Sequence, residues 1–296
     1  MINYTDRITG LVRDIVTRVP ALGDLDTDEL LIFARYGRSR AEGAYATCHC
    51  LTLPPTDPGY YYWCDRRSGR VTRRSEWFVT KSPQVSIHGR PVHYLISFVL
   101  PRFCDQTLEQ SRKRRSYPGA PPWIAKLDTI VHELYHVDPS RGGIRKIERR
   151  CGGAAATAHG RSFFERVAGM VRQYLESGPD PEVYGFLRHG FAELSERCGP
   201  VTATTFRTFP SFPQRYLETL EAQPPSPPSI HVQPIRQPQL PTVYTERDLE
   251  TRLFLEPEAA RAARKARHRR SPVPTHRTVL MDQASPGGAP EPVSQA

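Results

Sequence analysis

The run His132-Glu133-Leu134-Tyr135-His136 constrains the fold more than any other part of this 296-residue chain. On an α-helix, positions four residues apart lie one turn apart on the same face, so His132 and His136 can reach one metal ion together. Glu133 lies one position further round the helix and can take a proton from a water molecule on that ion. The run therefore predicts a helix that carries two zinc ligands and a general base.

The residues before and within this run predict a helix with two different faces. Pro121 and Pro122 suit a first helical turn, and apolar residues recur after them at helical spacing. At about 100° per residue, the large apolar side chains form one stripe, and the two histidines fall on the other side beside Ala125 and Thr129. The stripe consists of Leu127, Ile130, Val131 and Leu134. We expect the stripe to pack on a core and the histidines to line a cleft, the alternative being an amphipathic helix whose polar residues are only solvated.

A catalytic zinc ion commonly takes three protein ligands, so a third donor is expected further along the chain. We favour His159, because it precedes Gly160 and stands at the start of a second apolar pattern with helical spacing. That pattern consists of Phe163, Phe164, Val167, Met170, Val171 and Tyr174. Glu165 and His189 are alternative donors, whereas Asp138 is better suited to an outer position.

The sequence patterns before the HELYH run predict an α+β protein. Residues 6–18 and 27–36 carry apolar residues at helical spacing, and both segments are predicted helices. Between residues 44 and 100 the chain is rich in aromatic and β-branched residues, which favour strands. The predicted strands are 60–63, 77–80, 84–87 and 92–100. We expect a small antiparallel sheet packed with the histidine-bearing helices, in which 92–100 is either an edge strand that pairs with substrate or wholly internal.

The C-terminal quarter differs from the rest in composition. Residues 222–296 hold 13 of the 29 prolines and few large apolar residues, so they contribute little to a core. We therefore predict one folded domain over 1–221 and a largely disordered, basic tail over 222–296. Within the tail, 256–270 consists of strong helix formers.

The apolar segments and the cysteines indicate in which cellular compartment the protein is expected. No segment has the length of a membrane span or the pattern of an export signal, so we expect a cytoplasmic protein without membrane contact. The six cysteines lack the dense spacing of a secreted disulfide-rich domain. Cys48, His49, Cys50 and Cys64 are candidates for a second, structural zinc site, the alternative being ordinary half-buried strand cysteines.

The net charge of +10 comes from 41 basic and 31 acidic residues, and many basic residues lie in clusters. Arg112-Lys113-Arg114-Arg115 precedes the HELYH run, and a tail cluster occupies 261–270. A further cluster follows the run and consists of Arg145, Lys146, Arg149 and Arg150. Such clusters can bind DNA phosphates in a salt-dependent manner, and the simpler interpretation is solubilising charge on loops and a tail.

The two histidine motifs together resemble those of the SprT-like zinc metallopeptidases and related phage metallopeptidases, in which HExxH is followed after a variable loop by HGxxF. The second motif here reads His159-Gly160-Arg161-Ser162-Phe163. The resemblance covers residues 25–196 in the order of elements and implies a zincin-like domain. It also implies that His132, His136 and His159 bind one Zn2+ and that Glu133 is the general base. The chain departs from the family in its long insert, 137–158, and in lacking paired CxxC zinc knuckles.

These observations predict a zinc-dependent metallopeptidase that cleaves a protein or peptide substrate. The histidines would bind zinc as neutral imidazoles, and Glu133 would pass a proton from water to the leaving amine. Two alternatives stay open. One is a DNA-associated SprT-like protease that the basic clusters recruit, and the other is a non-catalytic protein that binds nucleic acid or protein and in which the HELYH helix is structural.

Overall fold

The structure is a computed structural model in which Met1–Pro257 forms one unit and Glu258–Ala296 a second. It describes residues 1–37, 43–51, 60–64, 71–81, 83–109, 111–140, 143–145, 147–148, 154–155, 159–207, 216–219, 243–256 and 259. All elements discussed below belong to the first unit. In the part of the chain that is described, none of the helices has the length and apolar character needed to cross a membrane.

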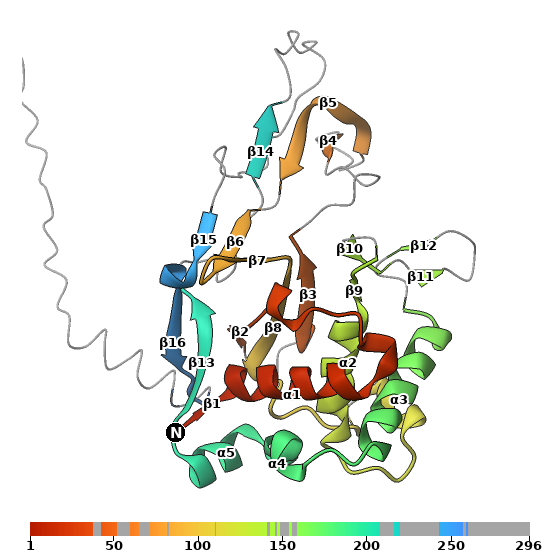
Figure 1. The fold of residues 1–296 in the computed structure, drawn as a ribbon, viewed down its shortest axis with the longest axis vertical. Coiled ribbons are helices and arrows are strands. Elements are labelled where there is room, and N and C mark those ends of the chain that lie inside the picture. Colours follow the sequence, from red (N-terminus) through yellow and green to blue (C-terminus); the bar gives the residue numbers. More distant parts are fainter. Residues whose placement is uncertain are drawn as a thin grey trace, which may run out of the picture. The chain divides into compact units, whose positions relative to one another are not determined.

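The sheet that packs against the HELYH helix has the strand order β2-β8-β3 (Figure 1). β2 (Leu30–Gly37) runs parallel to β8 (Tyr94–Pro101), and β3 (Ala46–Cys50) runs antiparallel to it. All residues of β8 are buried, as expected for a strand that is covered on both faces. The segment 92–100 is therefore central, so its prediction as an edge strand is wrong and the internal alternative is confirmed. β3 is an edge of this sheet instead.

The two faces of this sheet pack on two different cores. Side chains alternate between the faces along each strand. Ile96 and Phe98 face the larger core, which also contains residues of α1 (Tyr4–Arg18), α2 (Ile124–Tyr135) and α3 (Arg161–Glu176). On the other face, Leu95 joins a smaller core. The other buried members of that core are Phe33, Val85, Val92 and Phe206.

The two predicted N-terminal helices have different outcomes. The first is confirmed as α1, whose N-cap Asn3 accepts a hydrogen bond from the backbone N–H of Asp6. The second, over 27–36, is wrong, because Thr27–Glu29 forms only a short 3-10 helix, η2, and β2 begins at the next residue. β2 pairs with β8 along its whole length and is buried on both faces at Ile32, Phe33 and Ala34. Strand pairing and burial outweigh the helical spacing of the local sequence.

The other predicted strands form, but in several small sheets. The segments 60–63, 77–80 and 84–87 lie in β4 (Tyr60–Cys64), β5 (Val71–Lys81) and β6 (Gln84–Ile87). β4 and β5 join β14 (Tyr216–Thr219), whereas β6 lies between β7 (Arg90–Val92) and β15 (Val243–Thr245). Since β2 is parallel to β8 and β15 is parallel to β6, the expectation of one antiparallel sheet is wrong. The fold mixes helices and strands, consistent with the predicted α+β class.

The chain after α3 closes the first unit. It forms α4 (Pro181–Tyr184), η4 (Gly185–Arg188), α5 (Phe191–Cys198) and β13 (Val201–Phe206). β13 pairs with β1 (Ile2–Asn3) and with β16 (Leu249–Leu253). Phe254 is buried in the larger core, so the folded part extends past residue 221, where we expected it to end. The remainder of the predicted tail, including 261–270, lies outside the described residues.

Candidate metal centre

The HELYH run lies on the last turn of α2, as predicted. α2 ends at Tyr135, and His136 is its C-cap residue. The apolar stripe of this helix is buried in the larger core. The stripe residues are Leu127, Ile130, Val131 and Leu134. The opposite side is less open than we expected, because Ala125 and Thr129 are also buried, so the open part of the site is confined to the histidine end.

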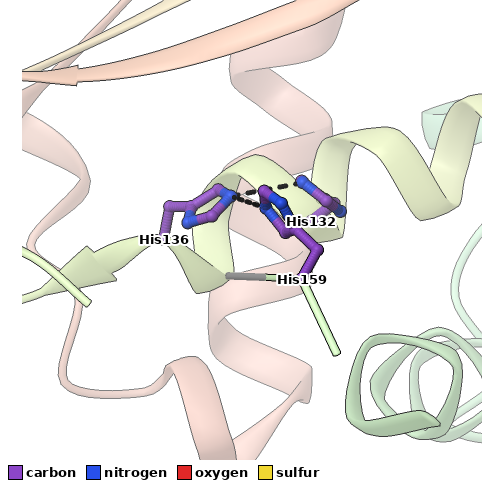
Figure 2. A group of neighbouring side chains, drawn as sticks. All are labelled: His132, His136 and His159. Carbon is purple, nitrogen blue, oxygen red and sulfur yellow. Dashed lines mark hydrogen bonds between the residues drawn. The ribbon is translucent and has the colours of Figure 1, made fainter. Parts of the chain in front are cut away.

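Three histidine side chains converge at this end of α2. Figure 2 shows the rings of His132 and His136 directed toward His159, which lies just before α3. The Nε2 atom of His136 is 3.2 Å from that of His132 and 3.0 Å from that of His159. One ligand atom from each residue lies within 4.8 Å of the others, and this is the metal-compatible group found among the described residues. The three histidines are therefore placed closely enough to bind one metal ion.

The donor set fits a zinc ion. Zinc–nitrogen bonds are about 2.0–2.1 Å long, so two imidazole nitrogens on one tetrahedral ion lie about 3.3 Å apart. The two Nε2–Nε2 distances at His136 are close to this value. Three neutral imidazoles also leave the fourth position of a tetrahedral ion for water, as in catalytic sites.

α3 brings the third histidine into place. His159 precedes Gly160, which is the N-cap residue of α3. The ring of Phe163, in the first turn of this helix, is buried beneath all three histidines. Its centroid is 4.8 Å from that of His132, 5.3 Å from that of His136 and 4.9 Å from that of His159. The HGxxF motif therefore contributes both a potential ligand and the apolar support for the other two.

The alternative donors do not join this group. Glu165 is exposed and forms an ion pair with Arg161 at 2.7 Å. His189 directs Nδ1 toward Glu193 at 2.7 Å. The carboxylate of Asp138 accepts a hydrogen bond from the hydroxyl of Ser140. Of the candidates considered from the sequence, His159 alone meets His132 and His136 within the part of the chain that is described.

The side chain of Glu133 extends from α2 to the edge strand β3. Its side chain is 7% exposed, and Oε2 accepts a hydrogen bond of 2.8 Å from the backbone N–H of Cys48. Burial raises the pKa of Glu133 to about 7, although the Cys48 hydrogen bond and the charge of Lys113 oppose this shift. The sequence did not predict the contact with Cys48, because it depends on which strand forms the edge of the sheet.

His132 and His136 favour the neutral form at neutral pH. Burial, followed by the neighbouring cationic groups, lowers the pKa of His132 to about 2 and that of His136 to about 4. A neutral imidazole is the form that binds a metal ion, so protons do not compete at these two positions near pH 7. Both Nδ1 atoms are buried and have no hydrogen-bond partner in the part of the chain described.

The metal-free protein is expected to lose stability as the pH falls from 6.5 to 4.5. In this range the unfolded chain protonates both His132 and His136, whose usual pKa is 6.5, and the folded chain protonates neither. Glu133 acts in the opposite direction, because its folded pKa of about 7 exceeds its usual 4.5. The unfolded state therefore binds about one more proton at these three sites, and they lower the free energy of unfolding by about 1.4 kcal/mol per pH unit.

Chemical denaturation of the metal-free protein at several pH values measures this dependence. Glu133→Gln removes the proton that the folded state takes up at Glu133. The change in the free energy of unfolding per pH unit that the site causes should therefore become about twice as large. Equal slopes for the variant and the wild type would show that the Glu133 carboxyl group is not buried as described.

Part of the first basic cluster belongs to the interior. The Nζ atom of Lys113 lies 2.6 Å from Oδ1 of Asp128 and 2.5 Å from Oγ1 of Thr129, both on α2. Tyr117 donates its hydroxyl to the other oxygen of Asp128 at 2.6 Å. Lys113 therefore anchors the segment before α2 and is unsuited to binding phosphate. DNA binding by the remaining basic residues stays a prediction, since Lys146, 149–150 and 261–270 lie outside the described residues.

Among the described residues, Cys48, His49 and Cys50 do not form a metal-compatible group. Cys48 and Cys50 are two positions apart on the strand and face the larger core, whereas His49 lies on the opposite face. The alternation of the strand separates these donors. Neither Cys48 nor Cys50 is in a disulfide, and their partial and full burial on a strand is consistent with the simpler interpretation. The side chain of Cys64 lies outside the described part of the structure.

Comparison with known proteins identified no relative. No family model matches the chain, and no curated protein or solved structure matches it either. Any functional assignment therefore rests on the residues and the geometry of the site, and the resemblance to SprT-like metallopeptidases stays a prediction.

Proposed function

We propose that this protein is a zinc-dependent metallopeptidase. The observation that carries the proposal is the convergence of three histidines, each with one ring nitrogen within 4.8 Å of the others, at the end of the helix that also carries the buried carboxyl group of Glu133. His132, His136 and His159 would hold the ion. A bound zinc ion supplies Lewis-acid activation of water and of a carbonyl group. This chemistry requires a base beside the ion, and Glu133 follows the first ligand directly in the sequence.

Glu133 suits the role of a base that accepts a proton and then returns it. An effective general base has a pKa near the working pH. Burial raises the pKa of Glu133 to about 7, and the hydrogen bond from Cys48 fixes one of its two oxygens. The second oxygen is then the acceptor for a proton from water, which Glu133 would pass to the leaving amine. His159 is exposed, so water and substrate can reach the site from its side.

β3 is the candidate strand for binding an extended substrate. The residues that flank β3 bond toward β8, through Tyr45 O with Val99 N at 2.9 Å and Leu51 N with His93 O at 2.8 Å, so that alternate residues between them do the same. The intervening residues Ala46, Cys48 and Cys50 therefore direct their backbone groups away from β8, and of these the Cys48 N–H donates to Glu133. A peptide that paired with this edge would lie beside Glu133, which supports backbone recognition without side-chain preference.

Metal content and metal-dependent cleavage test the proposed function. Protein purified without added metal should carry roughly one zinc ion per chain and should cleave an unfolded protein such as casein. Chelation should remove the zinc and abolish cleavage, and added zinc should restore it. Absence of zinc, without stabilisation by added zinc, would favour the non-catalytic alternative, in which α2 is only structural.

The DNA-associated alternative has a separate test. A salt-dependent mobility shift on DNA would support recruitment by the tail cluster if it is lost when 258–296 is deleted, a truncation that keeps β15, β16 and the buried Phe254. No shift at low salt would contradict it and would leave the peptidase proposal unaffected.

A further inference from the structure

Arg145 binds the end of the helix that carries His136. It follows β10 (Gly143–Ile144), which pairs with β9 (Val137–Asp138) in the insert between the second and third histidines. The backbone N–H of Arg145 donates to His136 O at 2.8 Å. Its side chain donates from Nε to Tyr135 O at 2.9 Å and from Nη2 to Val137 O at 3.2 Å. One residue therefore satisfies three consecutive carbonyl groups at the C-terminal end of α2.

These contacts replace hydrogen bonds that the helix cannot make. The last carbonyl groups of an α-helix have no partner within the helix, and a positive charge near them is favourable. The guanidinium carbon of Arg145 also lies 4.6 Å from the ring centroid of Tyr135, within reach of a cation–π contact. Arg145 thus holds the backbone on both sides of His136.

The hairpin that carries Arg145 is itself attached to the sheet. The hydroxyl of Tyr94, on β8, lies 3.3 Å from Asp138 O and 3.2 Å from Gly143 O, one on each strand of the hairpin. The position of Arg145 relative to α2 is therefore set by a buried strand.

His136 depends on this backbone support. Ligand histidines usually donate their second ring nitrogen to a carboxylate or carbonyl group, which fixes the ring. Nδ1 of His136 is buried without such a partner in the described part of the chain. Besides the other two histidines, the ring packs on Phe163, at 5.3 Å between centroids, and its position follows from the backbone at the end of α2.

We infer that Arg145 is a positioning residue of the metal centre, which holds His136 in place through the backbone carbonyl groups of residues 135–137. This inference rests on the proposed function, because it assigns a role in binding the ion. It makes Arg145, which the sequence placed in a basic cluster of the insert, part of the site.

A purely electrostatic role for Arg145 predicts the opposite effect on zinc. Its positive charge disfavours a proton on His136 and contributes to the lowered pKa of that group. The same repulsion would disfavour a zinc ion. Removing the charge would then strengthen zinc binding, whereas removing the positioning contacts would weaken it.

Zinc titration of the full-length protein against a chromophoric chelator distinguishes the two roles. We expect Arg145→Met to weaken zinc binding by about 10–100-fold, as for loss of other outer partners of metal ligands. Arg145→Lys retains the charge but not the two-pronged geometry, so its affinity should be intermediate. Arg90→Met is the matched control, because Arg90 is an exposed arginine that pairs with Asp28. It should bind zinc as the wild type does.

The absorption of the cobalt-loaded proteins provides a second readout. A displaced His136 should change the visible spectrum of Co2+ in Arg145→Met, and Arg145→Lys serves if the methionine variant does not fold. Zinc binding by Arg145→Met and Arg145→Lys that equals or exceeds that of the wild type would overturn the inference and leave the peptidase proposal standing. A wild-type protein that binds no zinc would overturn both.

Discussion

Glu133→Gln is expected to retain zinc and to lose peptide hydrolysis by about 10²–10⁴-fold, the usual contribution of general acid–base catalysis. Glutamine has nearly the shape of glutamate, and its amide oxygen can still accept the hydrogen bond from Cys48 that is 2.8 Å long in the wild type. It cannot accept and return a proton, so the loss should appear in kcat. The measurement is the initial rate of casein cleavage at saturating substrate, together with zinc content.

Glu165→Gln is the matched control for this variant. Glu165 lies on α3, near the metal centre in sequence, but it is exposed and pairs with Arg161. Its replacement should change neither zinc content nor the rate of cleavage. Undiminished cleavage by Glu133→Gln would remove Glu133 from the mechanism, and loss of zinc from this variant would assign Glu133 to the metal instead.

His159→Ala is expected to weaken zinc binding by more than about 100-fold. Loss of an outer partner of a ligand already costs about 10–100-fold, and loss of a ligand itself should cost more. The variant would retain only His132 and His136, with Nε2 atoms 3.2 Å apart on one helix. Because the imidazole of His159 is exposed, its removal should leave the fold intact. Zinc content after dialysis and circular dichroism check both parts of this expectation.

His189→Ala tests the specificity of that result. His189 was an alternative donor in the sequence, and its ring faces Glu193 in the structure. This variant should retain zinc as the wild type does. If His189→Ala lost zinc and His159→Ala retained it, the site described here would be wrong in its third member.

Local sequence patterns correctly predicted the helices that bury one apolar stripe. α1 and α2 each bury one stripe, so their apolar residues recur at helical spacing and both helices are confirmed. β2 contradicted its prediction as a helix, because pairing with β8 and burial on both faces outweigh the helical spacing of its apolar residues. The predicted strand 92–100 overlaps β8 at 94–100, but whether it lay at an edge depended on which segments paired with it.

The sequence by itself determined the pair His132 and His136 with Glu133 between them, because the period of a helix sets their spacing without help from distant residues. The tertiary structure decided which further groups join them. His159 is 23 residues from His136, and the Cys48 N–H that holds Glu133 is 85 residues away. Such contacts depend on the packing of α3 against α2 and on the position of β3 at the edge of its sheet. No local pattern encodes either arrangement, and the same is true of Arg145 at the end of α2.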